Sequence, residues 1–317
     1  MAPELLPLRS LGRTSLMVTP LCVGGSPLAS VPDIYGEEVH YERALDTVRG
    51  IFDSPINFLD TSNNYGAGES ERRIGSVISE RKGVPPGFVL ATKVDRDPKS
   101  GDFSAERVRR SAEESLERLG INCFQLLYLH DPEEVGFDAA MARGGPVEGL
   151  IALRDEGIAR YIGVAGGPVE LMRRFVRTGA FEALITHNRF TLVDRSAEPL
   201  VAEAFAAGLG VVNGAVFGGG ILAKGPGHTD RYAYSQTSRY VLGRVRAMEI
   251  ACRENAVPLK AAALQASVRD NRVSSTIVGA STREHVEELV DLMSVPVPLE
   301  LWEELAALLP PATEWLH

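Results

Sequence analysis

The chain repeats one pattern eight times: a short apolar run, a polar or glycine-rich turn, and a longer stretch with apolar residues at helical spacing. The apolar runs are rich in β-branched residues and occupy residues 20–24, 56–60, 88–94, 124–130, 161–165, 183–186, 211–216 and 275–279. Several runs are almost entirely apolar, which is typical of parallel strands buried on both faces. We therefore predict eight short buried strands.

Each predicted strand is followed by a stretch that predicts an amphipathic helix. These stretches occupy residues 41–52, 70–81, 104–119, 146–154, 168–178, 196–207, 259–269 and 282–292. In the first of them Ala44, Leu45, Val48 and Ile51 share one face. Ser104 stands where the third helix would begin, and its hydroxyl suits a helix cap.

Eight strand–helix units in about 280 residues predict an α/β protein, a closed parallel (β/α)8 barrel of the TIM type. An open doubly wound sheet would need a glycine-rich fingerprint after its first strand and an acidic residue about 20 positions later. Gly24 and Gly25 are too few for that fingerprint. We expect residues 7–19 to form a hairpin that plugs the bottom, and residues 237–256 and 298–309 to add two extra helices. Residues 1–317 should form a single barrel domain.

The charge balance limits the classes of partner. Lys and Arg number 33 and Asp and Glu 42, so the net charge is −9. That sign argues against nucleic acid and against a polybasic membrane patch. No apolar run reaches the roughly 20 residues that span a bilayer. Three widely spaced cysteines, without zinc spacing, and an N-terminus without a secretion signal favour a cytoplasmic protein with no metal site.

Polar side chains stand at the ends of three consecutive predicted strands. Asp60 ends the second strand, Lys93 lies near the end of the third, and His130 lies at the end of the fourth; Tyr65 follows Asp60 by five positions. Singly, each has an ordinary structural explanation, such as a turn cap or a lysine that reaches to water. Because functional groups of such barrels gather at the carboxyl ends of the strands, we expect the four around one mouth.

The four groups suit one kind of chemistry. A tyrosine with a pKa near 10 exchanges protons poorly at neutral pH. A lysine ammonium beside Tyr65 would stabilise its phenolate, and Asp60 would hold Lys93 charged. His130 would orient a substrate oxygen. Tyr65 then serves as general acid or base at a carbonyl or carbinol oxygen, and the site needs a separate hydride carrier.

These residues, in this order, resemble the aldo-keto reductase superfamily over nearly the whole chain. The segments that carry the resemblance are LGRTSLMVTPLCVGGSPL, NFLDTSNNYGAGESERRIG, VLATKV, LLYLHD, GLIALRDEGIARYIGVAG and TIVGASTREHVEEL. The resemblance implies that Asp60, Tyr65, Lys93 and His130 are a catalytic tetrad. Within the superfamily, THNRFTLVDRSAEPL, GVVNGAVFGGGILAKGP and VPLKAAALQ are similar to the aldose 1-dehydrogenases, which oxidise the anomeric carbon of a sugar to a lactone with a nicotinamide cofactor.

The same resemblance implies the cofactor positions. The loop after the seventh strand would hold the pyrophosphate with Val216, Phe217, Gly218, Gly219 and Gly220. The adenosine end would contact the family-matched positions Gly279, Ser281, His285 and Glu288. NADP-specific relatives commonly carry lysine and arginine where this chain has Gly279 and His285, so we expect NAD or NADP with NAD favoured, although Arg283 lies close by.

The chain departs from the family pattern where the nicotinamide is held. The fifth strand ends in Ala165 and Gly166 instead of Ser-Asn, the usual glutamine is replaced around His187 and Asn188, and the stacking aromatic is replaced by Gly214. We expect Asn188 and Phe217 to hold the reactive end of the cofactor instead.

The substrate is a small molecule that the sequence does not identify. Residues 131–145, 223–240 and 308–317 should rim its site, with Tyr232, Tyr234 and Trp315 as candidate contacts. Three functions stay open: aldose oxidation to a lactone, general NADPH-dependent aldehyde or ketone reduction, and a nicotinamide-binding regulatory subunit with little turnover. The assembly stays open between a monomer and a small homo-oligomer.

Overall fold

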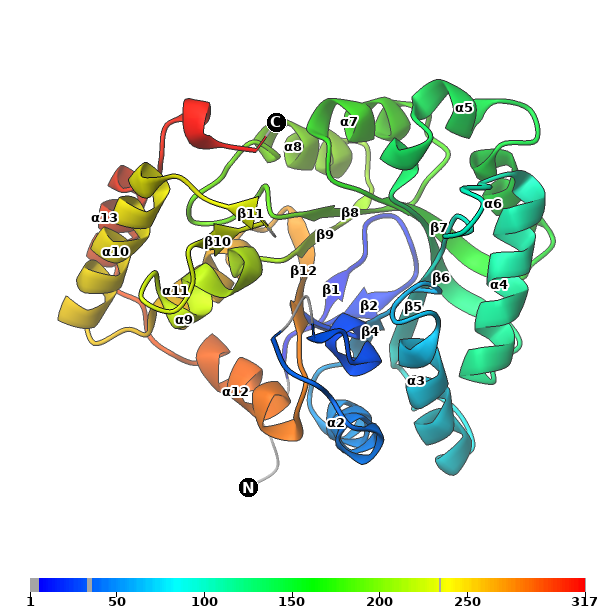
Figure 1. Cartoon of the computed structure of the whole chain (residues 1–317), viewed down its shortest axis with the longest axis horizontal. Coiled ribbons are helices and arrows are strands. Elements are labelled where there is room, and N and C mark those ends of the chain that lie inside the picture. Colours follow the sequence, from blue (N-terminus) through cyan, green and yellow to red (C-terminus); the bar gives the residue numbers. More distant parts are fainter. Residues whose placement is uncertain (1–5, 33–35, 234, 317) are drawn as a thin grey trace.

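The structure is a computed structural model that describes residues 6–32, 36–233 and 235–316. Eight parallel strands close a barrel in the order β12-β3-β4-β5-β6-β7-β8-β9. They are β3 (Leu21–Gly24), β4 (Phe58–Asp60), β5 (Val89–Val94), β6 (Phe124–His130), β7 (Ala159–Ala165), β8 (Ala183–His187), β9 (Gly210–Gly214) and β12 (Val273–Gly279). The predicted barrel is therefore confirmed (Figure 1).

Helices surround the strands as the periodicity predicts. They are α2 (Tyr41–Asp53), α3 (Glu69–Glu80), α4 (Ala105–Leu119), α6 (Pro146–Asp155), α7 (Val169–Arg177), α8 (Glu198–Ala206), α11 (Leu259–Val268) and α12 (Arg283–Met293). The Ser104 side chain caps α4 by accepting a hydrogen bond from the backbone N–H of Arg107 at 3.2 Å. The two predicted extra helices are α10 (Arg239–Glu254) and α13 (Leu299–Ala307).

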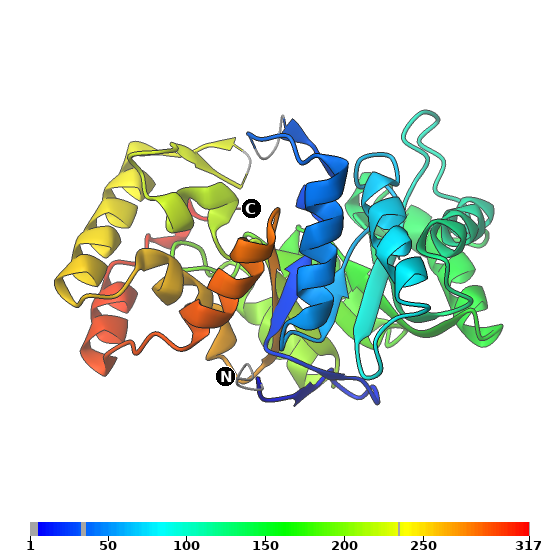
Figure 2. The ribbon, with the colours of Figure 1, turned by 90° about the horizontal axis from the view of Figure 1, so that it is seen from below.

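Shorter elements decorate the two ends of the barrel. The N-terminal hairpin pairs β1 (Arg9–Ser10) with β2 (Met17–Val18) and lies along the lower side in Figure 2. The hairpin of β10 (Arg231–Tyr232) and β11 (Ser235–Gln236) lies on the upper side. The sequence did not predict the latter hairpin, nor the following short helices: η1 (Ser26–Ala29), η2 (Pro132–Glu134), η3 (Gly218–Gly220), η4 (Ala312–Glu314), α5 (Phe137–Met141) and α9 (Ile221–Lys224).

The N-terminal hairpin closes the bottom of the barrel. Leu11 packs into the interior cluster that also holds Phe58 and Tyr128. The backbone N–H of Arg13 donates to the carbonyl of Gly208 at 2.8 Å, and its guanidinium donates to the carbonyl of Phe181 at 2.8 Å. Both carbonyls precede the first residues of neighbouring strands, so this end is sealed and the opposite end is left for chemistry.

The seventh barrel strand is shorter than predicted. The apolar run suggested a strand to residue 216, but β9 ends at Gly214. Ala215 has φ +54°, a left-handed conformation that takes the chain out of the strand. Val216 and Phe217 therefore begin the following loop.

None of the helices within the described residues is long and apolar enough to cross a membrane.

The plug yields a first prediction. Leu11→Ala should lower the free energy of unfolding by about 2–5 kcal/mol, because it leaves a cavity at a side chain that is 0% exposed. Leu8→Ala is the control, since Leu8 is 53% exposed and should change stability by less than about 0.5 kcal/mol. Urea unfolding followed by circular dichroism measures both, and equal midpoints for the two variants would contradict the plug.

Candidate active site

A buried lysine lies at the centre of the carboxyl end of the barrel. The Lys93 ammonium donates to Asp60 Oδ2 at 2.5 Å, to the carbonyl of Thr61 at 2.7 Å and to the Tyr65 hydroxyl at 3.2 Å. Lys93 is 2% exposed and Asp60 3% exposed. The ammonium thus has three oxygen partners, one of which is the phenol that the sequence singled out.

The charge on this lysine is stabilised locally. Burial disfavours an ammonium, but the Asp60 carboxylate and Tyr65 outweigh that effect and raise the pKa of Lys93 above its ordinary value. The lysine therefore stays protonated across the physiological range. A fixed positive charge beside the Tyr65 oxygen favours the phenolate over the phenol.

Helix α4 holds the loop that carries Tyr65 through two hydrogen bonds. The side-chain amide of Asn63 donates to the carbonyl of Ser111 at 3.0 Å, and the Arg118 guanidinium donates to the carbonyl of Asn63 at 3.0 Å. Gly66 and Gly68, with φ of +59° and +88°, then turn the chain sharply into α3. The phenol is consequently presented by a loop with fixed ends.

His130 stands at the end of β6, edge-on to the Tyr65 ring, with centroids 5.8 Å apart. Its Nδ1 lies 2.7 Å from Asp95 Oδ1 and 3.1 Å from the Ser62 hydroxyl. Ser62 uses its proton on Asp95 Oδ2 at 2.5 Å, so Nδ1 must be the donor to Asp95. This fixes the proton on Nδ1 and directs Nε2 away from the Asp95 carboxylate.

Asp95 is a site residue that the sequence reasoning missed. It is 6% exposed and also accepts a hydrogen bond from the backbone N–H of Asn64 at 3.0 Å. A signal existed, because Asp95 follows Lys93 by two positions and alternate residues of an extended chain share a face. Asp95 was missed because it lies one residue past the end of the predicted strand, residues 88–94.

The pKa of His130 is raised and the pKa of its partner Asp95 is lowered. Burial disfavours a charged imidazole, but Asp95 and then Asp131 outweigh it and raise the pKa of His130. Burial likewise opposes the Asp95 carboxylate, but His130 and Ser62 lower its pKa overall. The pair therefore stabilises the fold between these limits. Its contribution fades as the pH rises through the raised pKa of His130 or falls through the lowered pKa of Asp95.

Ala165, the last residue of β7, and Gly166 stand in place of the usual polar pair, and a glutamate fills the space beside Gly166. The backbone N–H of Gly167 donates to Glu133 Oε1 at 2.9 Å. A Cβ on Gly166 would lie 2.6 Å from Glu133 Oε2, so no larger residue fits there without displacing the carboxylate. The sequence reasoning noted the departure at Gly166 but did not find Glu133.

The end of β8 supplies a neutral histidine and a constrained asparagine. Burial, together with nearby Arg189, lowers the pKa of His187 to about 4. Asn188 adopts φ +60°, and its side-chain nitrogen lies 3.1 Å from His187 Nδ1. The side-chain oxygen of Asn188 is buried and has no hydrogen-bond partner among the described residues. This residue, predicted to hold the nicotinamide, thus has an acceptor available for an amide N–H.

Tyr232 does not contact a ligand site directly, contrary to the expectation from sequence. It is 7% exposed, and its hydroxyl bonds to the carbonyl of Asn188 and to the Thr191 hydroxyl, the latter at 2.9 Å. It therefore supports Asn188 from behind. Tyr234 lies outside the described residues. The Trp315 indole donates to the carbonyl of Pro310 at 2.9 Å, within the C-terminal tail itself.

The loop after β9 brings backbone to the mouth with little side-chain bulk. Val216 is buried and Phe217 is half-buried. Gly218, Gly219 and Gly220 all have positive φ. A Cβ on Gly218 would lie 2.3 Å from the Tyr232 ring, whereas one on Gly220 would meet no atom of the described residues within 4 Å. The open space at Gly220 is where a large ligand could approach the backbone closely.

The predicted adenosine-end residues gather at the start of α12. The Ser281 hydroxyl donates to Glu37 Oε1 at 2.6 Å and lies 3.2 Å from His285 Nδ1. Glu288 pairs with Lys260 at 2.5 Å, and the Lys260 ammonium lies 5.9 Å from the Phe217 ring centroid. Lys260 thus lies between α12 and the loop after β9.

Gly279 differs from the other cofactor positions. A Cβ there would lie 2.8 Å from Pro27 Cγ, so a proline of the loop after β3 takes the place of a longer side chain. No group of three or more His, Cys, Asp or Glu within the described ranges is arranged to hold a metal ion.

The fold and its cluster of Tyr, Lys, Asp and His define a barrel enzyme of oxidoreductase type, and comparison with known proteins agrees. The profile of the Aldo/keto reductase family matches residues 20–310. The chain belongs to the aldo/keto reductase family. Members of this family use a nicotinamide dinucleotide, NAD(P)H, as the redox cofactor.

Individual relatives are similar over most of their length. A D-threo-aldose 1-dehydrogenase of a Pseudomonas species is 31% identical over 84% of this chain and 87% of its own. An L-galactose dehydrogenase of Arabidopsis thaliana is 32% identical over 96% and 94%, and a pyridoxal 4-dehydrogenase of Microbacterium luteolum 29% over 94% and 96%. An aldo-keto reductase of Bacillus halodurans, in its holo form, shares the fold with a TM-score of 0.78, 22% identity and coverage of 96% and 97%.

The histidine pair yields a second prediction. Asp95→Asn should lower the pKa of His130, because it removes the carboxylate that outweighs burial. Histidine NMR titration measures this, with the His130 signal assigned from a His130→Gln variant. Asp97→Asn is the control, since it removes a carboxylate two positions along that bonds to the backbone N–H groups of Lys99 and Ser100 and not to His130. An unchanged His130 titration in Asp95→Asn would contradict the pairing.

Proposed function

We propose that the protein oxidises the anomeric carbon of an aldose to a lactone with NAD as the electron acceptor. The observation that carries the proposal is the buried Lys93 ammonium, held by Asp60 at 2.5 Å and placed 3.2 Å from the Tyr65 hydroxyl. That arrangement places a fixed positive charge where it stabilises the phenolate that would act as the base.

The residues of the chain divide the remaining work. A nicotinamide held at Asn188 would supply the acceptor for the hydride of the anomeric carbon. Tyr65 takes the proton of the hydroxyl on that carbon, and Lys93 stabilises the phenolate that does so. His130, oriented by Asp95, donates Nε2–H to the same oxygen in its protonated form, which Asp95 favours by raising the pKa of the ring. In the opposite direction Tyr65 donates the proton, so the residues themselves do not fix the direction.

The cofactor positions support a dinucleotide that runs from β8 to α12. Asn188 has a buried, unpartnered amide oxygen that suits the carboxamide N–H of a nicotinamide. The backbone around Gly220 has open space for a pyrophosphate, and Ser281 and His285 are hydrogen-bonding groups at the adenosine end. In such barrels the loops after the last two strands commonly hold phosphate groups.

Polar groups near the tetrad support a polyhydroxylated substrate. Asp131 Oδ2 lies 3.6 Å from His130 Nε2, Glu133 follows in the same loop after β6, and neutral His187 ends β8. Carboxylates and imidazoles suit the hydroxyls of a sugar better than an alkyl ketone. Two of the relatives are named for sugars, and a third for pyridoxal, which is the nearest alternative class.

The test is a third prediction. Purified protein with NAD⁺ should form reduced nicotinamide, read at 340 nm, with one or more of L-fucose, D-arabinose and L-galactose. Tyr65→Phe should slow the reaction by about 10²–10⁴-fold, because it removes the group that moves the proton. Calorimetric NAD⁺ binding should persist in the variant.

The other outcomes point elsewhere. Activity only with NADPH and simple aldehydes or ketones would replace the proposal with general carbonyl reduction. Nucleotide binding without turnover in either direction would favour the regulatory function. Full activity of Tyr65→Phe would contradict the assigned proton carrier.

A further inference from the structure

We propose that Glu37 is the residue that selects the cofactor: its carboxylate accepts a hydrogen bond from the 2′-hydroxyl of the adenosine ribose and repels a 2′-phosphate. This inference rests on the proposed function, because it takes the dinucleotide to lie along the loops after β9 and β12. The sequence pattern does not indicate position 37 as part of the cofactor site.

Glu37 reaches α12 from a segment far away in sequence. It precedes α2, and its Oε1 accepts the Ser281 hydroxyl at 2.6 Å across 244 positions of the chain. Arg43 lies 3.2 Å from Oε2. Ser281 is 6% exposed, whereas the Glu37 side chain is 44% exposed. One carboxylate oxygen is therefore anchored at the predicted adenosine end, and much of the side chain stays accessible.

The carboxylate is charged. The hydrogen bond from Ser281 and the neighbouring Arg43 lower the pKa of Glu37, which outweighs its slight burial. Ser281 in turn lies 3.2 Å from His285 Nδ1, and both are predicted adenosine-end residues. The ionised Glu37 carboxylate, bonded to Ser281 through one oxygen and paired with Arg43 through the other, thus stands where a 2′-phosphate would need a positive charge.

The cations nearby are engaged by other acids. Arg283, the residue that could have favoured NADP, bonds to Asp46 at 3.1 Å and lies 3.7 Å from Asp53, both on α2. Lys260 pairs with Glu288 at 2.5 Å.

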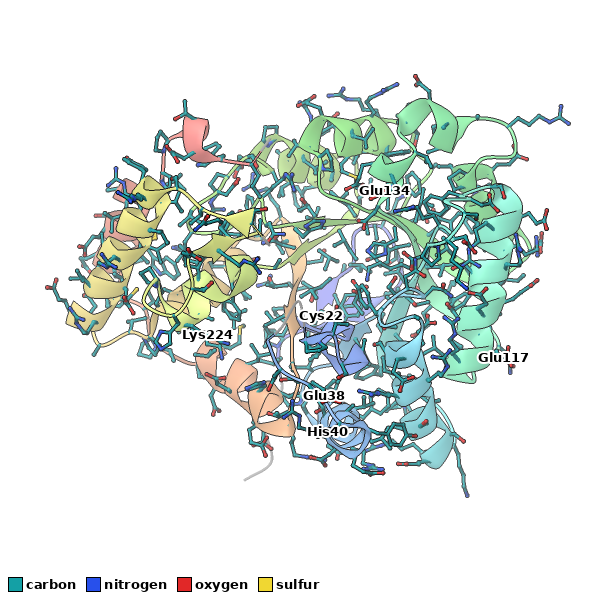
Figure 3. The ribbon with its side chains drawn as sticks, in the orientation of Figure 1. Cys22, Glu38, His40, Glu117, Glu134 and Lys224 are labelled. Atoms are coloured by element: carbon teal, nitrogen blue, oxygen red, sulfur yellow. The ribbon has the colours of Figure 1, made fainter. Side chains whose placement is uncertain are left out.

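Position 279 is a glycine, and a longer side chain there would meet Pro27. This position therefore offers no cation to a 2′-phosphate. Figure 3 places Lys224, at the end of α9, well apart from Glu38 and His40, which lie in the same segment as Glu37.

The chemistry distinguishes the two cofactors. A ribose hydroxyl is a donor that a carboxylate accepts, which is how an acidic residue reads NAD in doubly wound dinucleotide folds. A 2′-phosphate carries about two negative charges and offers only acceptors near neutral pH. Beside Glu37 it would meet like charge at short range, where the repulsion is weakly screened.

The fourth prediction concerns the cofactor preference. Isothermal titration calorimetry tests it by comparing the dissociation constants for NAD⁺ and NADP⁺. The full-length wild type should prefer NAD⁺. Glu37→Gln should reduce that preference by about tenfold or more, with NADP⁺ binding tightened and NAD⁺ binding weakened. Glu37→Ala should reduce it as well, because it removes the charge and the acceptor together.

Glu38→Gln is the matched control. It removes the same charge one position along, from a side chain that is 68% exposed and lies 3.7 Å from His40 instead of Ser281. The preference should be unchanged in this variant. Equal changes in Glu37→Gln and Glu38→Gln would overturn the inference, because they would indicate a general field and not a contact.

The remaining outcomes separate this inference from the function on which it rests. A wild type that binds NAD⁺, with a preference that Glu37→Gln and Glu37→Ala leave unchanged, overturns the role of Glu37 alone. A wild type that prefers NADP⁺ also overturns it. Failure of the wild type to bind either nucleotide overturns the proposed function and this inference together.

Discussion

The buried ion pair between Lys93 and Asp60 is the interaction on which the site depends. Moving two charges out of water costs several kcal/mol of free energy for each charge, and the interior of a barrel does not replace the lost hydration. The pair persists because β4 and β5 are hydrogen-bonded neighbours: Asp60 stands opposite Ala91, and Lys93 lies two positions further on the same face. The carbonyl of Thr61 and the Tyr65 hydroxyl satisfy the remaining ammonium protons.

The surroundings of the pair explain its stability and its direction. Below it the interior is filled by Tyr128, whose ring fits because residue 163 is glycine: a Cβ there would lie 2.4 Å from the ring. Cys22 lies in the middle of the barrel in Figure 3, and burial together with Asp60 raises the pKa of its thiol, so it is not a nucleophile near neutral pH. With the lower end sealed by the hairpin, the ammonium can act only toward Tyr65 and the mouth.

Much of this arrangement could be predicted from the sequence. The alternation of apolar runs and amphipathic stretches identified all eight barrel strands and their helices, because both periodicities are local properties of the chain. The four tetrad positions followed from one rule, that parallel barrel strands end at a common face. Asp60, Lys93 and His130 lie at or near such ends, and Tyr65 lies in the loop between them.

The features that were missed depend on contacts between distant segments. Tyr232 was expected to face a ligand, but the fold buries it behind Asn188, 44 positions away. Glu133 occupies the space beside Gly166, and Glu37 contacts Ser281. Both contacts join segments that are distant in the sequence. The predicted end of the strand β9 was wrong because Ala215 adopts a left-handed conformation, which the residue type alanine does not indicate.

The most direct test of the account is the pH at which the Tyr65 phenolate forms, read from ultraviolet difference absorbance near 295 nm with Tyr65→Phe as the reference. In Lys93→Met the phenolate should form at a pH about 1–3 units higher than in the wild type, because the neighbouring ammonium is lost. Thermal unfolding of each variant verifies that the barrel is intact. The same titration midpoint with and without Lys93 would contradict the claim that the lysine prepares the tyrosine for proton transfer.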